Sequence, residues 1–543
     1  MPASSMIPWP QPVDPLHSIA LSAVVAALPM VVLLVFMGFL RKSGVVAAAW
    51  GLLAAALLAL IVWRMPGLLI LVSAGFGFVY GLWPIMWIVF AALWLYNLSV
   101  DTGKFELLRQ WIAEHASGDS RIQVILVAFC FGALLEGTAG FGAPVAIAAY
   151  LLLGLGFSAR EAVTVCLIAN TAPVAFGGLG IPIVALAGVT GLSLAKLSSM
   201  AGRQVPFLAF VLPAYLVWVV AKRRGLREVW PAALVAGASF AMTQFAVSNF
   251  WGPYAADILA ALVSITAVSL FLRIWKPRLT KAVEHHAEPN GAASSVPPGL
   301  STRQAVEAWA PWVLLSAVMV AWSYFKVLAR GQLVLPVPHL HNAVFITLYG
   351  KRYAALYVFQ PLAAGTAALT ATFLTALACR ARPAAVMRSG IATFRQLKLP
   401  SLTVALIVAL AYLYNYSGMA YTLGAALARL GWLFPFVSGF LGWTACFLSG
   451  SDTASNLLFG NLQVAAAHQL GLNPVLLAAT NSSGAVTGKM ISPQNIAVGV
   501  TTVGLIGQEG NVLRTTVWHS LLLAAALSVL AFLQAYWLKW MIP

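Results

Sequence analysis

Two carboxylic acids lie inside long apolar stretches of this sequence, at points where small residues interrupt the hydrophobic pattern. Glu136 precedes GTAGFGAP (137–144), and Asp452 lies in SGSDTASN (449–456). Glycine and proline favour breaks in a helix at such points. An acid inside a bilayer costs about 2.5–3.5 kcal/mol on insertion scales and usually has a function. An acid beside a broken helix is typical of the binding site of a transporter.

The chemistry that these acids suit is proton coupling. Desolvation favours the neutral form of a carboxyl group, so a buried acid can bind a proton facing one side of a membrane and lose it facing the other. Glu136 and Asp452 are therefore the candidate proton carriers. A structural alternative is that both acids cap half-helices, because an acid suits a helix N-terminus and SDT is a good capping sequence.

Other polar residues in the breaks could bind a small anion. Lys489 is the one base in these motifs, and it can pair with a substrate carboxylate, pair with Asp452, or cap a helix C-terminus. Helix N-termini at NTAPV (170–174) and NSSG (481–484) would offer free N–H groups to an anion. The predicted substrate-binding residues are Gly140, Asn170, Thr171, Asn481, Ser482, Ser483 and Lys489.

The composition places these motifs in a membrane. Of the 543 residues, 61% are hydrophobic and only 8% are charged, whereas soluble proteins have about 25% charged residues. Apolar runs near the length that crosses a bilayer recur along the chain, and the short alternating segments of a membrane barrel are absent from the sequence. We therefore predict an all-α polytopic membrane protein with roughly 12–14 membrane-embedded helical segments.

Charge and reactive residues argue against other classes. The net charge of +17 comes from Lys and Arg between apolar runs, as the positive-inside rule expects, so we expect no nucleic-acid partner. The four cysteines lie in apolar runs without metal-ligand spacing. The histidines are scattered or in expected loops, and a paired histidine in the linker (His285, His286) suits a solvated loop better than a metal tract. We expect no enzyme, metal or cofactor.

The order of apolar runs predicts the topology. Spans are expected near 19–40, 45–63, 67–100 (in two pieces), 205–220, 230–248, 255–272, 309–325, 354–378, 401–415, 431–448 and 516–537. Asp257 falls near the start of one span and is expected at a membrane interface, and the basic residues of 380–398 are expected in an inner loop. Residues 101–121 predict either an amphipathic helix on the inner membrane surface or an ordinary loop helix.

The two broken regions resemble each other in kind. In each, an acid is followed by an apolar stretch and, about thirty residues on, by a break that begins with Asn170 or Asn481. We therefore predict an N-terminal half (1–275), a cytoplasmic linker (276–303) and a C-terminal half (304–543). Their arrangement is the pattern of an inverted-topology repeat with broken or re-entrant helices, whose site lies where the repeats meet.

Several long motifs resemble the L-lactate permease family. They are GLWPIMWIVFAALWLYNLSVDTGKFE (81–106), EGTAGFGAPVAIAAYLLLGLGF (136–157), CLIANTAPVAFGGLGIPI (166–183), SGSDTASN (449–456) and NSSGAVTGKMISPQNIA (481–497). The resemblance covers nearly the whole chain. It implies a multi-pass protein of the bacterial inner membrane that imports lactate, and in some members glycolate, with a proton and without ATP. It also implies, more distantly, inverted repeats whose re-entrant hairpins carry substrate in an elevator-like motion.

The sequence leaves some alternatives open. Thr138 and the pair Ser482 and Ser483 depart from the family pattern inside the expected site, which leaves the choice among 2-hydroxymonocarboxylates open. The main rival is a symporter of another small organic anion, coupled to sodium; a membrane enzyme or receptor is the rival from another class. Small-residue helix faces suit either a homodimer or internal packing, so the oligomeric state is open.

Overall fold

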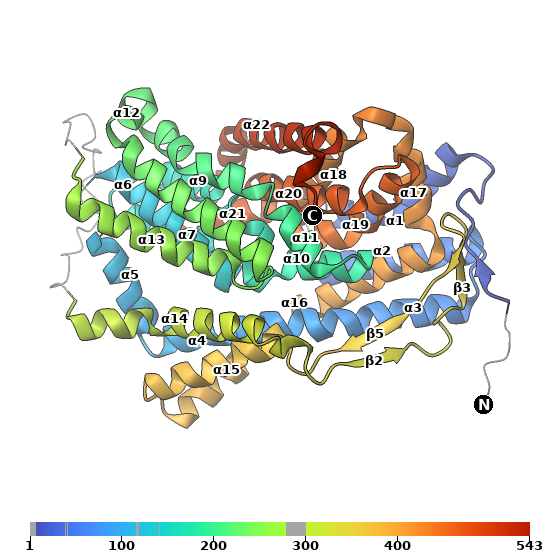
Figure 1. Cartoon of the computed structure of the whole chain (residues 1–543), viewed down its shortest axis with the longest axis horizontal. Coiled ribbons are helices and arrows are strands. Elements are labelled where there is room, and N and C mark those ends of the chain that lie inside the picture. The colour runs from blue at the N-terminus through green and yellow to red at the C-terminus, as the bar shows by residue number, and fades with distance from the viewer. Residues whose placement is uncertain (1–6, 39, 41, 116–118, 141, 278–299) are drawn as a thin grey trace.

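The computed structural model is a bundle of long helices with a few short strands at one end (Figure 1). It describes residues 7–38, 40, 42–115, 119–140, 142–277 and 300–543. Within these ranges, ten helices are long and apolar enough to cross a membrane, or eleven if a bent pair at 159–190 counts as one span. Pro144–Gly154 and Ala364–Ala378 are shorter apolar helices. The prediction of an all-α polytopic membrane protein is confirmed.

The first helices follow the expected spans. They are α1 (Ile19–Gly38), α2 (Gly44–Ile61), α3 (Gly67–Tyr80) and α4 (Trp87–Asp101). Between α3 and α4 lies a wider helical turn, η1 (Gly81–Met86), in which Trp83 leaves helical geometry with φ −134° and ψ 118°. Pro84 follows it, and a residue before proline is disfavoured in the helical region. The prediction of two pieces in 67–100 is therefore confirmed.

Helix α5 (Lys104–His115) docks on protein rather than lying alone. Its residues Phe105, Leu108 and Ile112 are buried, and its Trp111 packs edge-on against Trp309 of α14 (Thr302–Tyr324), with ring centroids 5.0 Å apart. Of the two alternatives for 101–121, the structure favours the ordinary helix, because the apolar face meets other helices.

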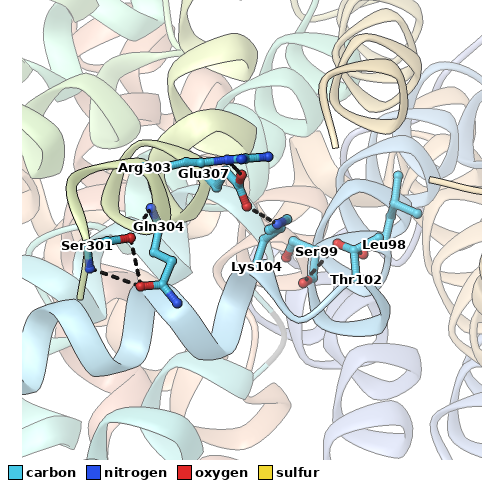
Figure 2. A network of polar contacts seen from close by, with 8 residues as sticks. All are labelled: Leu98, Ser99, Thr102, Lys104, Ser301, Arg303, Gln304 and Glu307. Carbon is cyan, nitrogen blue, oxygen red and sulfur yellow. Dashed lines mark hydrogen bonds and ion pairs between the residues drawn. The ribbon is translucent and has the colours of Figure 1, made fainter. Parts of the chain in front are cut away.

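Polar contacts tie the start of α5 to α14, and Figure 2 shows them. Glu307 accepts from Lys104 of α5 at 2.5 Å and from Arg303 of its own helix at 2.9 Å. Ser301 and Gln304 form a capping box that satisfies the first N–H groups of α14. These contacts hold the start of α5 against α14.

The first broken region lies in a buried part of the bundle. Its elements are α6 (Ser120–Gln123), η2 (Val124–Phe131), α7 (Gly132–Thr138), α8 (Ala143–Gly154), α9 (Ala159–Ala169), η3 (Val174–Phe176), α10 (Gly177–Thr190) and α11 (Leu194–Ala201). Helix α12 (Val205–Phe250) kinks at Lys222, with φ 55°, so it contains the two spans expected at 205–220 and 230–248. Helix α13 (Ala256–Ile274) runs back beside it.

The middle of the chain differs from the sequence prediction in two places. The span expected at 354–378 begins as strand β5 (Leu356–Phe359), and only α15 (Ala364–Ala378) is helical. Three of the basic residues expected in a loop at 380–398, namely Arg388, Arg395 and Lys398, lie on α16 (Pro383–Ser417), which is 35 residues long and includes the span predicted at 401–415. This first part of α16 is amphipathic: Arg388, Arg395 and Lys398 are exposed while Thr393 and Leu397 are buried, so the charges do not end the helix.

The segment that joins α14 to α15 supplies four strands, and they take part in two small sheets at one end of the bundle (Figure 1). Strands β1 (Trp9–Pro10), β3 (Val344–Ile346) and β4 (Lys351–Arg352) form one, in which β1 and β3 are parallel. Strands β2 (Leu333–Pro336) and β5 form an antiparallel pair. Gln11 also donates to the carbonyl groups of Asn415 and Tyr416 at 2.8 Å, so the first described residues are held against the end of α16.

The second broken region is built from α17 (Met419–Leu427), α18 (Phe434–Ser449), α19 (Asp452–Gln469), α20 (Pro474–Gly488), η7 (Lys489–Ile491), α21 (Pro493–Thr502) and α22 (Glu509–Tyr536). Helix α10 of the first region packs on α19 of the second near the middle of the bundle (Figure 1). Most of the predicted linker at 276–303, including both of its histidines, lies outside the described residues. The division into halves and the inverted repeat stay predictions.

Candidate functional site

A small pocket lies where the two broken regions meet. Its volume is about 70 Å³, and because one water needs about 10–15 Å³ of such volume, it can hold a molecule of a few heavy atoms. The first region supplies an apolar and glycine-rich wall, and the second supplies hydroxyl groups and a lysine. The lining residues are Glu136, Gly140, Val174, Gly177, Gly178, Ile181, Pro182, Gly450, Ser451, Asp452, Thr453 and Lys489.

The first break brings Glu136 to this pocket. Helix α7 ends just after Glu136, and the chain turns through Gly140, with φ 56°, into α8. Such positive φ angles suit glycine because it lacks a Cβ atom. Gly177 lies directly against the acid: a Cβ atom there would be 2.7 Å from Glu136 Oε1. Glycine at 177 is therefore what allows the carboxylate to lie against the backbone of the second part of the break.

Lys489 reaches this carboxylate from the other half of the chain. Its Nζ lies 2.6 Å from Glu136 Oε1, and the side chains are 8% and 5% exposed. Asn170 Nδ2 donates to Glu136 Oε2 at 3.0 Å. Of the pairings that the sequence left open, the one with Asp452 is wrong, because Lys489 pairs with Glu136. The lysine does stand at the C-cap of α20, but its amine serves the ion pair rather than the helix end.

Asp452 lines the same pocket from the first turn of α19. The N-cap of that helix is Ser451, whose Oγ accepts from the Ala454 N–H at 3.3 Å. Asp452 is 3% exposed, and its Oδ2 accepts from Ser482 Oγ at 2.8 Å. Its Oδ1 has no hydrogen-bond partner among the described residues. Ser451 is thus the N-cap, as the capping interpretation of SDT predicts, and Asp452 lies in the first turn of the helix, where an acid suits the helix dipole.

The helix N-termini predicted at NTAPV and NSSG are wrong. Asn170 stands at the C-cap of α9, and Asn481–Gly484 lie inside α20, which breaks only at Lys489. The small residues of NSSG serve close packing instead: a Cβ at Gly484 would lie 2.0 Å from the carbonyl oxygen of Gly439, a typical use of glycine between membrane helices. Among the described helices, α10 (from Gly177) and α19 (from Asp452) have N-termini that border the pocket.

The predicted substrate-binding residues divide into two groups. Gly140 and Lys489 line the pocket, and Asn170 and Ser482 contact its acids. Asn481 donates to Asn456 Oδ1 at 3.0 Å and Ser483 donates to Gln204 Oε1 at 2.7 Å, away from the pocket lining. Thr171 is buried and does not line the pocket. We therefore do not place Asn481, Ser483 or Thr171 among its ligands.

Sequence reasoning missed a buried acid behind the first break. Asp257 of α13 was expected at a membrane interface, but it is 1% exposed. Its Oδ1 accepts from Gln244 Nε2 at 2.8 Å, and the same amide donates to the carbonyl oxygen of Ala172 at 3.1 Å. Gln244 and Asp257 thus hold the backbone of the break in place. The signal was ambiguous because an acid in the first turn of a helix usually serves the helix dipole.

Relatives of this chain are transport proteins over their whole length. The glycolate permease GlcA of Escherichia coli (strain K12) is 44% identical over 556 residues, which cover 98% of this chain and 99% of that protein. The L-lactate permease of Salmonella typhimurium is also 44% identical and covers 98% of this chain and 100% of its own length. The L-lactate permease of Bacillus subtilis is 42% identical with the same coverage.

A solved structure supports the fold alone. MtrF of Neisseria gonorrhoeae, described as illuminating a class of antimetabolite efflux pumps, has a TM-score of 0.52 at 12% identity and covers 93% of this chain and 97% of its own. The sequence model described as L-lactate permease matches residues 22–538. Together with relatives that are 42–44% identical from end to end, this match shows that the chain belongs to the L-lactate permease family.

Proposed function

We propose that this protein imports L-lactate, and glycolate as a smaller substrate, by proton symport across the bacterial inner membrane. The names of its relatives support the substrate class, and the many apolar helices support a multi-pass membrane location. The observation that carries the coupling is the buried ion pair between Glu136 and Lys489 in the pocket. If a substrate anion displaces Glu136 from Lys489, the anion and a proton on Glu136 would bind together.

The anion would bind beside the positively charged and N–H groups that line the pocket. Lys489 offers an ammonium group on one side of the pocket. On another side, the N–H groups of Asp452 and Thr453 begin α19, and the first N–H groups of a helix have no partner within the helix. Anions are favoured at such an end. A carboxylate that meets both features receives charge-assisted hydrogen bonds, which are roughly twice as strong as neutral ones.

Binding of the anion forces a proton onto Glu136. When a substrate carboxylate takes Lys489, Glu136 loses its cation in a place that is only 4% exposed. An ionised carboxylate that is buried without a partner is strongly disfavoured, so the protonated form becomes the more stable one. When the pocket is empty, the Glu136–Lys489 pair carries no net charge. When the pocket is loaded, protonated Glu136, the ammonium group of Lys489 and the substrate carboxylate together carry no net charge either. Both states can therefore cross the membrane region at a similar cost.

The coupling proton belongs on Glu136 rather than on Asp452. Both acids are buried lining residues, but the described contacts of Asp452 include no cation that a substrate could remove. Anion binding therefore changes the surroundings of Glu136 far more than those of Asp452. The histidines take no part in this scheme, and no enzymatic step is needed.

Uptake into proteoliposomes tests the proposal. Purified protein is given labelled L-lactate or glycolate under an inward proton gradient, with potassium or sodium as the bulk cation. We expect accumulation that follows the proton gradient and is the same in either salt. Accumulation that needs a sodium gradient would replace proton coupling by sodium coupling. If folded protein moves neither substrate, the substrate class is wrong, and other small carboxylates should be screened.

A further inference from the structure

Asp452 has a hydrogen-bonding position in the pocket that nothing in the described protein fills. One carboxyl oxygen is fixed by Ser482 Oγ at 2.8 Å, and the other, Oδ1, is buried without a partner. The residue lines the same pocket of about 70 Å³ as Lys489. A buried polar atom that remains unpaired destabilises its state, so Oδ1 is the atom that gains most when a ligand arrives with a polar group.

The residues that line the pocket differ in the ligand groups that they attract. Lys489 and the start of α19 attract a carboxylate, whereas the carboxyl group of Asp452 does not attract a second negative charge. Val174 and Ile181 also line the pocket, and apolar residues of this kind suit a methyl group. The ligand group left for Asp452 is a neutral polar one close to the carboxylate. A hydroxyl group both donates and accepts, so it satisfies this carboxyl whether or not the acid carries a proton.

We propose that Asp452 hydrogen-bonds the 2-hydroxyl group of the substrate and thereby makes the pocket selective for 2-hydroxymonocarboxylates over acids of the same length that lack the hydroxyl. The inference rests on the proposed function and states which small acids its pocket would bind most tightly. Asp452 then serves specificity, while Glu136 carries the coupling proton. Ser482 is a positioning residue, because it holds the carboxyl group with Oδ1 toward the ligand.

Two pairs of acids isolate the hydroxyl group. L-lactate differs from propionate, and glycolate from acetate, by that group alone. The measurement is the concentration of each acid that halves uptake of labelled L-lactate into proteoliposomes. In the unaltered protein, each hydroxy acid should compete at least about tenfold better than the matching acid without the hydroxyl group. This ratio corresponds to the free energy of one buried hydrogen bond.

Variants at Asp452 then test the assignment. Asp452→Ala should reduce both ratios to about threefold or less, whereas Asp452→Asn, which still donates and accepts, should keep most of the selectivity and stay proton-driven. Asp257→Asn is the matched control, since it alters a buried acid outside the pocket lining and should keep both ratios. If Asp452→Ala does not fold, Ser482→Ala should lower both ratios by freeing the carboxyl group.

The outcomes separate this inference from the proposed function. Equal competition within each pair in the unaltered protein, or unchanged selectivity in both Asp452→Ala and Ser482→Ala, would overturn the inference while lactate transport stands. Asp452→Asn that keeps its selectivity but loses proton-driven uptake would leave the hydroxyl contact intact and would contradict the proposed function, because it would return the coupling proton to Asp452. Absence of all lactate uptake by the unaltered protein would be a failure of the proposed function itself.

Discussion

Lys489 Nζ lies 2.6 Å from Glu136 Oε1, so two residues that are 353 positions apart in the chain close one buried ion pair at the pocket. Breaking such a pair by removing one partner typically costs about 3–5 kcal/mol, because the other charge stays buried. In the proposed mechanism, a substrate carboxylate would break it without that cost, because Glu136 would be protonated at the same time.

Removing the lysine should weaken substrate binding. Lys489→Ala takes away the ammonium group, and the loss of a charged hydrogen bond of about 1.5–3 kcal/mol corresponds to a roughly 10–150-fold rise in the lactate concentration for half-maximal uptake. The dependence of uptake on pH should weaken as well, because Glu136 would lack its cation whether or not substrate is bound. Lys104→Ala is the control, because it removes an ion pair that lies outside the pocket (Figure 2). Unchanged lactate affinity in Lys489→Ala would leave Lys489 as a structural residue.

A single methyl group at Gly177 should disturb the ion pair. In Gly177→Ala the new Cβ would stand 2.7 Å from Glu136 Oε1, so the carboxylate must move away from its present position. We expect proton-driven uptake to fall by about tenfold, the effect of about 1.4 kcal/mol. Gly154→Ala is the matched control, since a Cβ there meets no atom within 4 Å. Full activity in Gly177→Ala would show that the close approach is not needed.

The apolar wall should set the size of the substrate. Val174→Ala enlarges the apolar lining that would face the methyl group of lactate in the proposed binding mode. One methylene group in such a pocket is worth about 10–200-fold in discrimination, so the variant should improve 2-hydroxybutyrate relative to lactate by about tenfold. Competition against labelled lactate measures this. Val145→Ala, a buried valine outside the pocket lining, should leave the ranking as it is; a similar shift there would point to general loosening.

The hydrogen bonds that Gln244 donates to Asp257 and Ala172 should stabilise the folded protein. Gln244→Leu leaves the carbonyl oxygen of Ala172 and Asp257 Oδ1 without their shared donor, at about 1–3 kcal/mol for each group. We expect a lower midpoint of thermal unfolding in detergent. Asp257→Asn keeps an acceptor for Gln244 and should lose much less. Equal losses would mean that the charge of Asp257, rather than its hydrogen bond, supports the break.

Much of the fold and part of the site could be read from the sequence. Long apolar runs locate most spans, because the length and polarity of a membrane helix are local properties. Glu136, Asp452 and Lys489 stood out because a charged residue among small residues in an apolar run is rare. The ends of α16 were harder, since an amphipathic helix can carry Arg388, Arg395 and Lys398 on its exposed face and continue into the membrane.

The rest depends on contacts between distant segments. The sequence offered a substrate carboxylate or Asp452 as the partner of Lys489 but not Glu136, because Glu136 lies 353 positions away and meets the lysine only in the folded chain. Small residues were ambiguous as well: around Gly140 they allow a break, whereas around Gly484 they allow two helices to pack closely within a continuous α20. Asp257 was missed because its burial is created by Gln244 and Gly137, which lie on other helices.

The coupling of lactate to a proton can be measured directly in vesicles that contain a pH-sensitive dye. Lactate entering down its own gradient should acidify the interior by one proton per anion in the unaltered protein, beyond the change in protein-free vesicles. In Glu136→Gln, net proton-linked uptake and its acidification should disappear, while exchange of internal for external lactate persists. Acidification by Glu136→Gln at the unaltered ratio would contradict the account, because the proton would then travel without Glu136.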